Sequence, residues 1–244
     1  MQLNCDLGES YGRWTLESES AAMPHIDQAN IACGFHAGDP VSIQQTLLLA
    51  KQYNVSVGAH PSYPDLQGFG RRSMQCSEQE IIALLHYQIA ALEGLAKCAG
   101  IVIDYVKPHG ALYNDMMSKE DVRRAVFSAI GSYHRSLPLM VLATANQDEI
   151  EEQANQAGIT LYFEAFADRC YDDNGQLLSR KQAGAVHDID KTLQQVKQLC
   201  ESGSVTTHSG KILQLQADSL CVHGDNSQAV EALTAIRKMV EQCR

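Results

Sequence analysis

The segment from Asn30 to Pro40 reads NIACGFHAGDP and joins two kinds of local structure. Its first half is a β-leaning run. Asp39 followed by Pro40 is typical of a helix start, because Asp caps free amide groups and Pro suits the first helical position. Between the two, His36 occupies a tight turn between glycines. An imidazole there packs poorly and reaches a ligand easily, so this stretch predicts a strand, a helix and a candidate site residue.

The same change, from a short β-rich run to apolar residues at helical spacing, recurs along the chain. The clearest helical pattern runs from 77 to 99, where a mostly apolar stripe has helical spacing and Ser77 with Glu80 forms a capping-box signature. Residues 204–217 are predicted to form an inserted hairpin that turns at Ser209 and Gly210. Weaker helices are predicted at about 41–53, 119–135, 147–157, 188–200 and 227–243. Strands are predicted at about 3–7, 26–33, 55–60, 103–107, 137–143, 160–167 and 220–223.

Strands that alternate with helices imply parallel strands joined by right-handed crossovers. Such strands form either an open doubly wound sheet or a closed barrel. The chain has no G-x-G-x-x-G after its first strand and no G-x-x-x-x-G-K-[ST], the phosphate-binding signatures of open-sheet nucleotide folds. Its 244 residues are close to the ~250 of a (β/α) barrel. We therefore predict one α/β domain over residues 1–244, an irregular parallel (β/α) barrel of about seven strands.

Composition narrows the classes of partner. The net charge of −10 and the lack of a Lys/Arg-rich run argue against nucleic acid or an anionic membrane as the main partner. We expect no secretory signal, because MQLNCDLGES lacks a basic n-region and a long apolar h-region, and no apolar stretch is expected to approach the length of a membrane span. The eight cysteines are scattered without a C-x-x-C pair, which favours reduced thiols over disulfides or a zinc cluster. We therefore expect a cytoplasmic protein.

Polar residues gather at the predicted strand ends, which meet on one rim of a parallel barrel, where the loops carry the chemistry. Four histidines lie there in turns flanked by Gly or Pro, and clustered titratable groups mark function. The other five histidines are expected to be structural or exposed. The predicted catalytic residues are Asp6, His36, His60, Lys107, His109, Asp168 and His223. The predicted substrate-binding residues are Asn4, Glu9, Arg71, Arg72, Tyr113, Arg169 and Asp225.

These side chains are carboxylates, imidazoles, a lysine and arginines, without a serine in a G-x-S-x-G elbow. The set suits general acid–base attack by water, or a hydrolytic metal held by Asp and His. Asp6, His36 and His60 can form a three-ligand metal site with one open position, although their spacing is not a recognised metal signature. Whether a metal is bound therefore stays open.

The cationic residues also have two explanations. Lys107 and the arginines can clamp a carboxylate or a phosphate, and arginine does so with two parallel hydrogen bonds. Salt bridges at the rim account equally well for Arg71, Arg72 and Arg169.

Six segments of the chain resemble the LamB/YcsF family: NCDLGES, ANIACGFHAGDP, GAHPSYPDLQGFGRR, VKPHGALYN, FADRCYDDNGQL and LCVHGDN. The resemblance extends from Asn4 to the last helix. It implies a seven-stranded barrel similar to the glycoside hydrolase/deacetylase barrels. It also implies ATP-dependent hydrolysis of 5-oxo-L-proline (pyroglutamate) to L-glutamate, performed with partner subunits B and C. ATP, with or without Mg²⁺, is the implied cofactor, and the sequence leaves open which subunit binds it.

Two alternative functions remain at this stage. One is a metal-dependent deacetylase or amidohydrolase of small N-acyl compounds, which rests on Asp6, His36 and His60 and on analogy of fold. The other is a non-catalytic scaffold subunit. The dense polar rim argues against the scaffold, because the cores of protein interfaces are depleted of charge.

Overall fold

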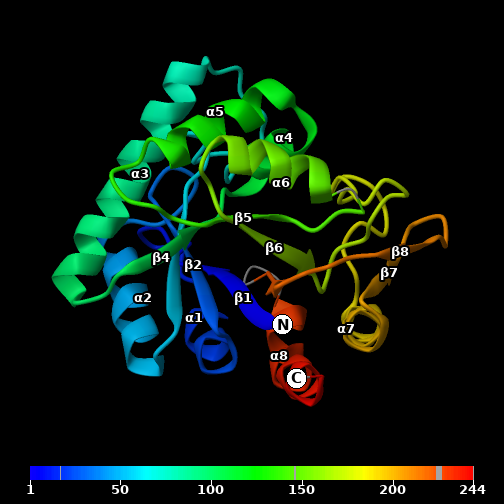
Figure 1. Ribbon diagram of the computed structural model, residues 1–244. Coiled ribbons are helices and arrows are strands. Elements are labelled where there is room, and N and C mark those ends of the chain that lie inside the picture. The colour runs from blue at the N-terminus through cyan, green and yellow to red at the C-terminus, as the bar shows by residue number, and fades with distance from the viewer. Residues whose placement is uncertain (17, 146, 224–226, 244) are drawn as a thin grey trace.

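The computed structural model describes residues 1–16, 18–145, 147–223 and 227–243. Within these residues, seven parallel strands close into a barrel and helices surround it (Figure 1). The strands in order around the barrel are β1 (Gln2–Leu7), β2 (Gln28–Ala32), β3 (Ser56–His60), β4 (Ile103–Val106), β5 (Leu139–Leu142), β6 (Leu161–Phe166) and β9 (Ser219–Val222). Strand β9 pairs with both β6 and β1 and so closes the ring. The predicted parallel barrel is confirmed.

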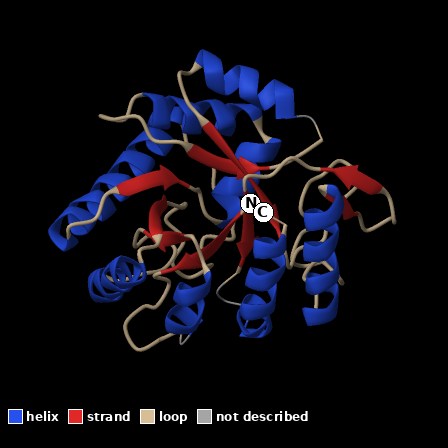
Figure 2. Cartoon of the chain, turned by 60° about the horizontal axis from the view of Figure 1, so that its bottom comes forward, coloured by secondary structure: helices blue, strands red, loops and turns tan. Residues whose placement is uncertain are grey.

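Helices form the outer layer, and Figure 2 shows the strands in the middle with the helices outside them. The helices are α1 (Ser18–Ala22), the 3₁₀ turn η1 (Met23–His25), α2 (Pro40–Tyr53), α3 (Glu78–Ala99), α4 (Gly110–Ser118), α5 (Glu120–Gly131), α6 (Gln147–Gln156), α7 (Ile189–Ser202) and α8 (Ser227–Gln242). The predicted hairpin is confirmed as the antiparallel pair β7 (Ser204–Thr206) and β8 (Ile212–Gln214). Helices α1 and α4 were not predicted.

Capping residues set the start of two helices, as the sequence predicts. Asp39 accepts hydrogen bonds from the backbone N–H groups of Val41 and Ser42 at the start of α2. Ser77 and Glu80 form both bonds of a capping box at the start of α3. Each cap satisfies amide groups that have no partner inside the helix, which fixes where the helix begins.

Helix α3 corrects one expectation. Over an 18-residue window its mean hydropathy is 1.3, so by length and composition alone it is able to cross a membrane. Its apolar face nevertheless packs on the barrel and against α5. The buried side chains of α3 are Ile81, Leu85, Gln88, Ile89, Leu92 and Ala96. Core helices of globular proteins share this composition, so α3 gives only weak support for a membrane.

The interior of the barrel is polar, which is what places the site. Successive side chains of a strand point to opposite faces, so on β1 Leu3, Cys5 and Leu7 pack outward into the apolar core while Asn4 and Asp6 point inward. The inward side chains hydrogen-bond to one another between strands, as Asn30 of β2 does to Asn4 of β1. A column of hydrogen-bonded groups thus replaces apolar layers beneath the carboxyl ends of the strands.

Candidate active site

A cavity of about 480 Å³ opens at the carboxyl ends of the strands. Eight of the predicted site residues line it: Asp6, His60, Arg71, Lys107, His109, Tyr113, Arg169 and His223. They come from β1, β3, β4, β6, β9 and the segments that follow these strands, as expected for the rim of a parallel barrel. A cavity of this size suits a small-molecule ligand.

Lys107 is the centre of the polar floor. Its Nζ lies 2.9 Å from Oδ1 of Asp6 and 3.0 Å from Oε2 of Glu164, and all three side chains are buried. Nζ also donates to Oδ1 of Asn4 at 3.2 Å. Burial alone lowers the pKa of Lys107, but the charge of Asp6, with Cys221 and Glu164, outweighs it and raises that pKa well above its usual value. The ammonium is therefore held charged, with its three protons engaged.

Asp6 is held as a carboxylate by the same arrangement. Burial alone raises its pKa, but His60 and Lys107 outweigh burial and keep the pKa well below its usual value. Asn30 donates to Oδ1 of Asp6 at 2.7 Å, and the hydroxyl of Tyr105 donates to Asn30 at 2.6 Å. Sequence reasoning missed Asn30 and Tyr105 as site residues. Their inward positions on β2 and β4 were the available signal.

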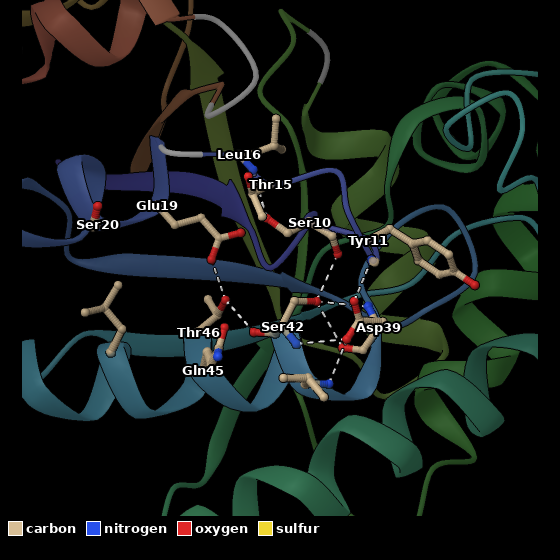
Figure 3. Close-up of a pocket in the computed structure, with 13 residues that line it drawn as sticks. Ser10, Tyr11, Thr15, Leu16, Glu19, Ser20, Asp39, Ser42, Gln45 and Thr46 are labelled. Atoms are coloured by element: carbon tan, nitrogen blue, oxygen red, sulfur yellow. Dashed lines mark hydrogen bonds between the residues drawn. The ribbon is translucent and has the colours of Figure 1, made fainter.

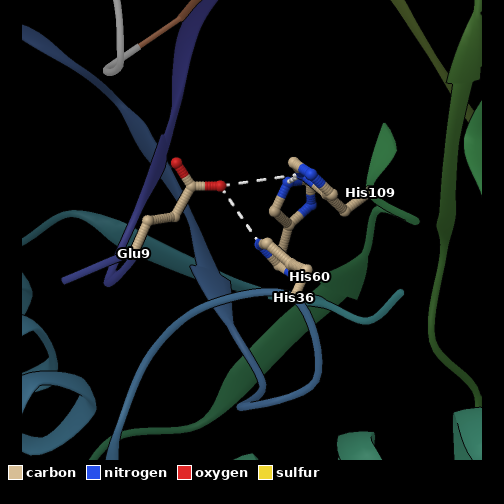
Figure 4. A group of neighbouring side chains, drawn as sticks. All are labelled: Glu9, His36, His60 and His109. Atoms are coloured by element: carbon tan, nitrogen blue, oxygen red, sulfur yellow. Dashed lines mark hydrogen bonds and ion pairs between the residues drawn. The ribbon is translucent and has the colours of Figure 1, made fainter. Parts of the chain in front are cut away.

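Three histidines and a glutamate form a second group beside this floor (Figure 4). Nδ1 of His109 lies 2.9 Å from Nε2 of His60, and Oε1 of Glu9 lies 3.1 Å from Nε2 of His36. The rings of His36 and His109 are stacked, with their centroids 3.7 Å apart. Burial, followed by the charges of neighbouring histidines, lowers the pKa values of His36 and His109 well below the usual value. These two rings are therefore neutral.

The backbone passes close to this group. Phe69 has a left-handed φ of 54°, and its carbonyl accepts a hydrogen bond from Nε2 of His109 at 2.9 Å. Gly70 follows at φ 64°, where an added Cβ would lie 2.7 Å from the His109 ring and 2.8 Å from His36. Only glycine allows this approach, because it has no Cβ. The backbone of residues 68–72 (GFGRR) thus packs directly against the histidines.

His223, which follows β9, forms a pair with Asp168, which follows β6. Nδ1 of His223 lies 2.8 Å from Oδ1 of Asp168, which is fully buried. Burial raises the pKa of Asp168, but His223 outweighs it and the pKa falls to about 2. The carboxylate therefore fixes the orientation of the imidazole, as in carboxylate–histidine pairs generally. This leaves Nε2 of His223 as the nitrogen able to act on a bound molecule.

Arginines bring positive charge to the same cavity. Arg71, Arg169 and Arg180 line it. Burial, and then the charge of Arg180, lower the pKa of Arg169 to about 10. Such crowding of like charges is relieved by an anion, and guanidinium groups match carboxylate and phosphate geometry. Arg180 was missed, because nothing in its local sequence shows that residues 176–181 fold over the cavity.

Tyr113 and Glu164 are neighbouring buried groups at this site. Within the described chain, the hydroxyl of Tyr113 and Oε1 of Glu164 have no hydrogen-bond partner of good geometry. Burial, and then the charge of Glu164, raise the pKa of Tyr113 well above its usual value. Tyr113 also lines the cavity, so its hydroxyl is a neutral donor available to a bound molecule. Buried polar groups are costly to leave unpaired.

Not every predicted site residue reaches the cavity. Arg72 does not line it; its side chain is 64% exposed and pairs with Asp65, which is the salt-bridge alternative. Asn4, Glu9, His36 and Asp168 lie one layer behind the lining, where Asn4 contacts Lys107, Glu9 and His36 contact His109, and Asp168 contacts His223. Asp225, with the neighbouring Asn226, lies outside the described residues.

A larger cavity of about 900 Å³ lies elsewhere, between the segment after β1 and helix α2 (Figure 3). Its lining contains no histidine, lysine or arginine among the described residues. Its two carboxylates are engaged, since Asp39 caps α2 and Glu19 accepts from Thr46 at 2.5 Å and from the N–H of Gly8 at 3.1 Å. The chemically equipped cavity is therefore the smaller one.

The sequence and the fold match known proteins along their whole length. The LamB/YcsF family pattern matches residues 1–244. A protein of Pseudomonas fluorescens (strain Pf0-1), named as the A subunit of 5-oxoprolinase, is 49% identical over 241 residues, 98% of this chain and 96% of that protein. One of the same name from Chromohalobacter salexigens is 50% identical over 236 residues, 96% of this chain and 94% of that protein. The solved lactam utilization protein of Thermus thermophilus superposes with a TM-score of 0.89 at 38% identity, covering 99% of this chain and 96% of that one.

Proposed function

Since this chain belongs to the LamB/YcsF family, we propose that it is the A subunit of a 5-oxoprolinase, which hydrolyses 5-oxo-L-proline to L-glutamate. The relatives named for that activity cover nearly the whole chain. The observation that carries the proposal in this structure is one cavity that holds both a cluster of arginines and the Asp168–His223 pair.

The arginines suit the carboxylate of the substrate. 5-Oxo-L-proline is an anion at neutral pH, and its carboxylate is its most strongly charged group. Arg169 already donates to the carbonyls of Ala185 and Leu178, so its position is fixed before a ligand arrives. Arg71 and Arg180 complete the positive side of the cavity. A preorganised guanidinium binds a carboxylate at little cost in side-chain freedom.

His223 is the proposed general base and acid. Its Nε2 takes a proton from the attacking water and then gives one to the ring nitrogen as the C–N bond breaks. Asp168 stays ionised because its pKa is about 2, and it stabilises the imidazolium that forms. Asp6 is a poorer base, since its pKa lies well below the usual value and efficient general bases have pKa values near the working pH.

Lys107 and Tyr113 have different roles in this proposal. Lys107 is surrounded by four acceptors, on Asp6, Glu164, Asn4 and Cys221, so it is a positioning residue that fixes the floor of the cavity. Tyr113 keeps its proton, and its hydroxyl lies beside Glu164 without a hydrogen bond of good geometry among the described residues. We assign Tyr113 to the lactam oxygen, which its hydroxyl positions by donating a hydrogen bond before phosphoryl transfer.

Hydrolysis of an unstrained lactam needs activation, because its carbonyl is a stabilised amide. Transfer of the γ-phosphoryl group of ATP to the lactam oxygen releases ADP and makes the carbon electrophilic. Water then adds, the C–N bond breaks with protonation of nitrogen, and a second water releases phosphate from the acyl phosphate. We propose that partner subunits B and C supply the ATP site, with Mg²⁺, since this chain lacks a phosphate-binding loop signature.

The experiment is a reconstituted assay of this chain with subunits B and C, in which glutamate and ADP are both measured. We expect one ADP for each glutamate. Glutamate formation with no use of ATP, or ATP use with no glutamate, would contradict the proposal. The eight cysteines are all free thiols, which suits a reducing compartment, and we propose the cytoplasm as the location.

A further inference from the structure

The outward nitrogens of two buried histidines are fixed as donors by backbone carbonyls. Nδ1 of His60 lies 2.7 Å from the carbonyl oxygen of Lys107, and Nε2 of His109 lies 2.9 Å from that of Phe69. A carbonyl oxygen only accepts, so each of these nitrogens carries its hydrogen. A ring that carries only this hydrogen has a lone pair on its other nitrogen, which is Nε2 in His60 and Nδ1 in His109. These two atoms face each other at 2.9 Å.

His36 repeats the arrangement with a hydroxyl. The Ser62 hydroxyl donates to the carbonyl of Tyr63 at 2.8 Å, so its oxygen accepts from Nδ1 of His36 at 3.1 Å. Nε2 of His36 is then the nitrogen without hydrogen. It lies 3.1 Å from Oε1 of Glu9, another acceptor. Two pairs of acceptor atoms are thus pressed together inside the protein.

Such contacts require positive charge between the atoms. A proton on His60 or His109 would relieve their contact, and it would leave the contact between His36 and Glu9 as it is. One divalent ion serves both, because the four inner atoms all lie within 4.8 Å of one another. Outer hydrogen bonds that fix the ring nitrogens are also the usual support of metal-binding histidines.

We propose that His36, His60, His109 and Glu9 bind one divalent transition-metal ion of the zinc class. Bonds of 2.0–2.1 Å to a tetrahedral ion place the ligand atoms roughly 3.3 Å apart. Three of the six separations, at 2.9, 3.1 and 3.6 Å, bracket that value, and the others lie within 4.8 Å. Three imidazoles and one carboxylate favour zinc, cobalt or nickel over magnesium and calcium, which prefer oxygen ligands.

This ligand set differs from the Asp6, His36 and His60 set considered from the sequence. Oδ1 of Asp6 is engaged by Lys107 and Asn30, and Oδ2 lies 3.4 Å from Nε2 of His60. Asp6 is therefore a neighbour of the ion, and Glu9 and His109 complete the site. The inference rests on hydrogen-bond geometry alone and holds whatever reaction the cavity performs.

The site borders the substrate cavity, because His60 and His109 also line that cavity. With four protein ligands a tetrahedral ion has no open position for a carbonyl or a water, so an ion bound there would fix the histidine wall of the cavity. The residues of this chain hold the ion and shield it, since all four side chains are buried.

The test measures metal binding directly. Tag-free chain is treated with a chelator, dialysed and titrated with Zn²⁺ by calorimetry and with Co²⁺ by visible absorption, with Mg²⁺ as a third titrant. We expect one Zn²⁺ or Co²⁺ per chain, Co²⁺ absorption typical of a four-coordinate site, a higher Tm with Zn²⁺, and no response to Mg²⁺. A wild-type chain that binds neither Zn²⁺ nor Co²⁺, or that binds Mg²⁺ instead, overturns the proposal.

Variants assign the ligands. His36→Ala with His109→Ala should weaken Zn²⁺ binding by at least about 100-fold. His134→Ala is the control, because His134 is an exposed partner of Glu93 on another part of the surface. Glu9→Gln keeps the size of the side chain and should weaken binding about 10-fold, so it decides the case if the double variant does not fold. Wild-type affinity in Glu9→Gln and in a folded double variant overturns the assignment.

Discussion

Nε2 of His60 lies 2.9 Å from Nδ1 of His109, although the two residues are 49 positions apart and each ring already donates its other N–H to a backbone carbonyl. The contact depends on where the backbone carries those carbonyls. Lys107 continues β4, and Phe69 sits in a left-handed turn. The position of the rings is therefore as sensitive to backbone conformation as to the histidines themselves.

At Gly110 the effect of backbone conformation near these rings can be measured as a change in the free energy of unfolding. Gly110 has φ 57°, and an added Cβ would lie 2.5 Å from the carbonyl oxygen of Gly70. We expect Gly110→Ala to lower the free energy of unfolding by about 2 kcal/mol, because both the backbone angle and the contact become strained. Urea unfolding measures the loss.

Gly94→Ala is the matched control for that experiment. Gly94 lies inside α3, and a Cβ there meets nothing within 4 Å. The same substitution should raise the free energy of unfolding by about 0.5–1 kcal/mol, since glycine is a poor helix former. Equal effects at the two positions would show that the contact with Gly70 does not govern stability.

The sequence predicted the barrel because its signals are local. Capping residues at Asp39 and Ser77 and short β-rich runs are legible without tertiary information. Helix α4 was missed for a local reason as well. Its N-cap residue His109 makes no side-chain cap bond and its first residue is a glycine, so no start signal is present.

The site was predicted in part. Rim histidines stand out because Gly and Pro flank them, whereas Asn30 and Tyr105 are recognised only when strand alternation is extended into the barrel. Arg71 and Arg72 are adjacent in sequence, yet only Arg71 lines the cavity, and Arg72 pairs with Asp65. Which of two neighbouring arginines turns inward depends on the path of the GFGRR loop. Tertiary packing decides that path.

The Asp168–His223 pair gives a prediction for activity. Asp168→Asn and His223→Gln should each lower kcat of the reconstituted enzyme by about 10²–10⁴-fold, the usual contribution of general acid–base catalysis. His208→Gln is the control, since His208 is exposed at the hairpin turn. Glutamate formation at near-normal kcat in His223→Gln would remove His223 from the proton transfers.

The same pair gives a pH dependence of stability. The pKa of Asp168 falls from 3.8 to about 2 on folding, so its stabilising effect is full above pH 4 and is lost as the pH falls toward 2. The shift corresponds to about 2 kcal/mol. The difference in free energy of unfolding between wild type and Asp168→Asn should shrink over that range. A difference independent of pH between 4 and 2 would contradict the low pKa.

Arg169 gives a prediction for substrate recognition. Arg169→Gln should raise KM for 5-oxo-L-proline about 30-fold, because a charge-assisted hydrogen bond contributes about 2 kcal/mol. Arg72→Gln should leave KM unchanged, since Arg72 lies outside the cavity lining. 2-Pyrrolidinone, the same lactam without the carboxylate, separates the explanations. If Arg169→Gln impairs the reaction of 2-pyrrolidinone as strongly, Arg169 does not bind the carboxylate.

The last prediction concerns the chain without its partners. The lone chain, with ATP and Mg²⁺, should form glutamate at a negligible rate, and adding subunits B and C should start turnover with ATP consumed in step. Each tenfold gain in rate requires 1.36 kcal/mol off the barrier, and a stabilised amide without an activated leaving group presents a high one. General acid–base catalysis by His223 supplies only about 10²–10⁴-fold. Rapid glutamate formation by the lone chain would mean that its own side chains activate the lactam without phosphorylation.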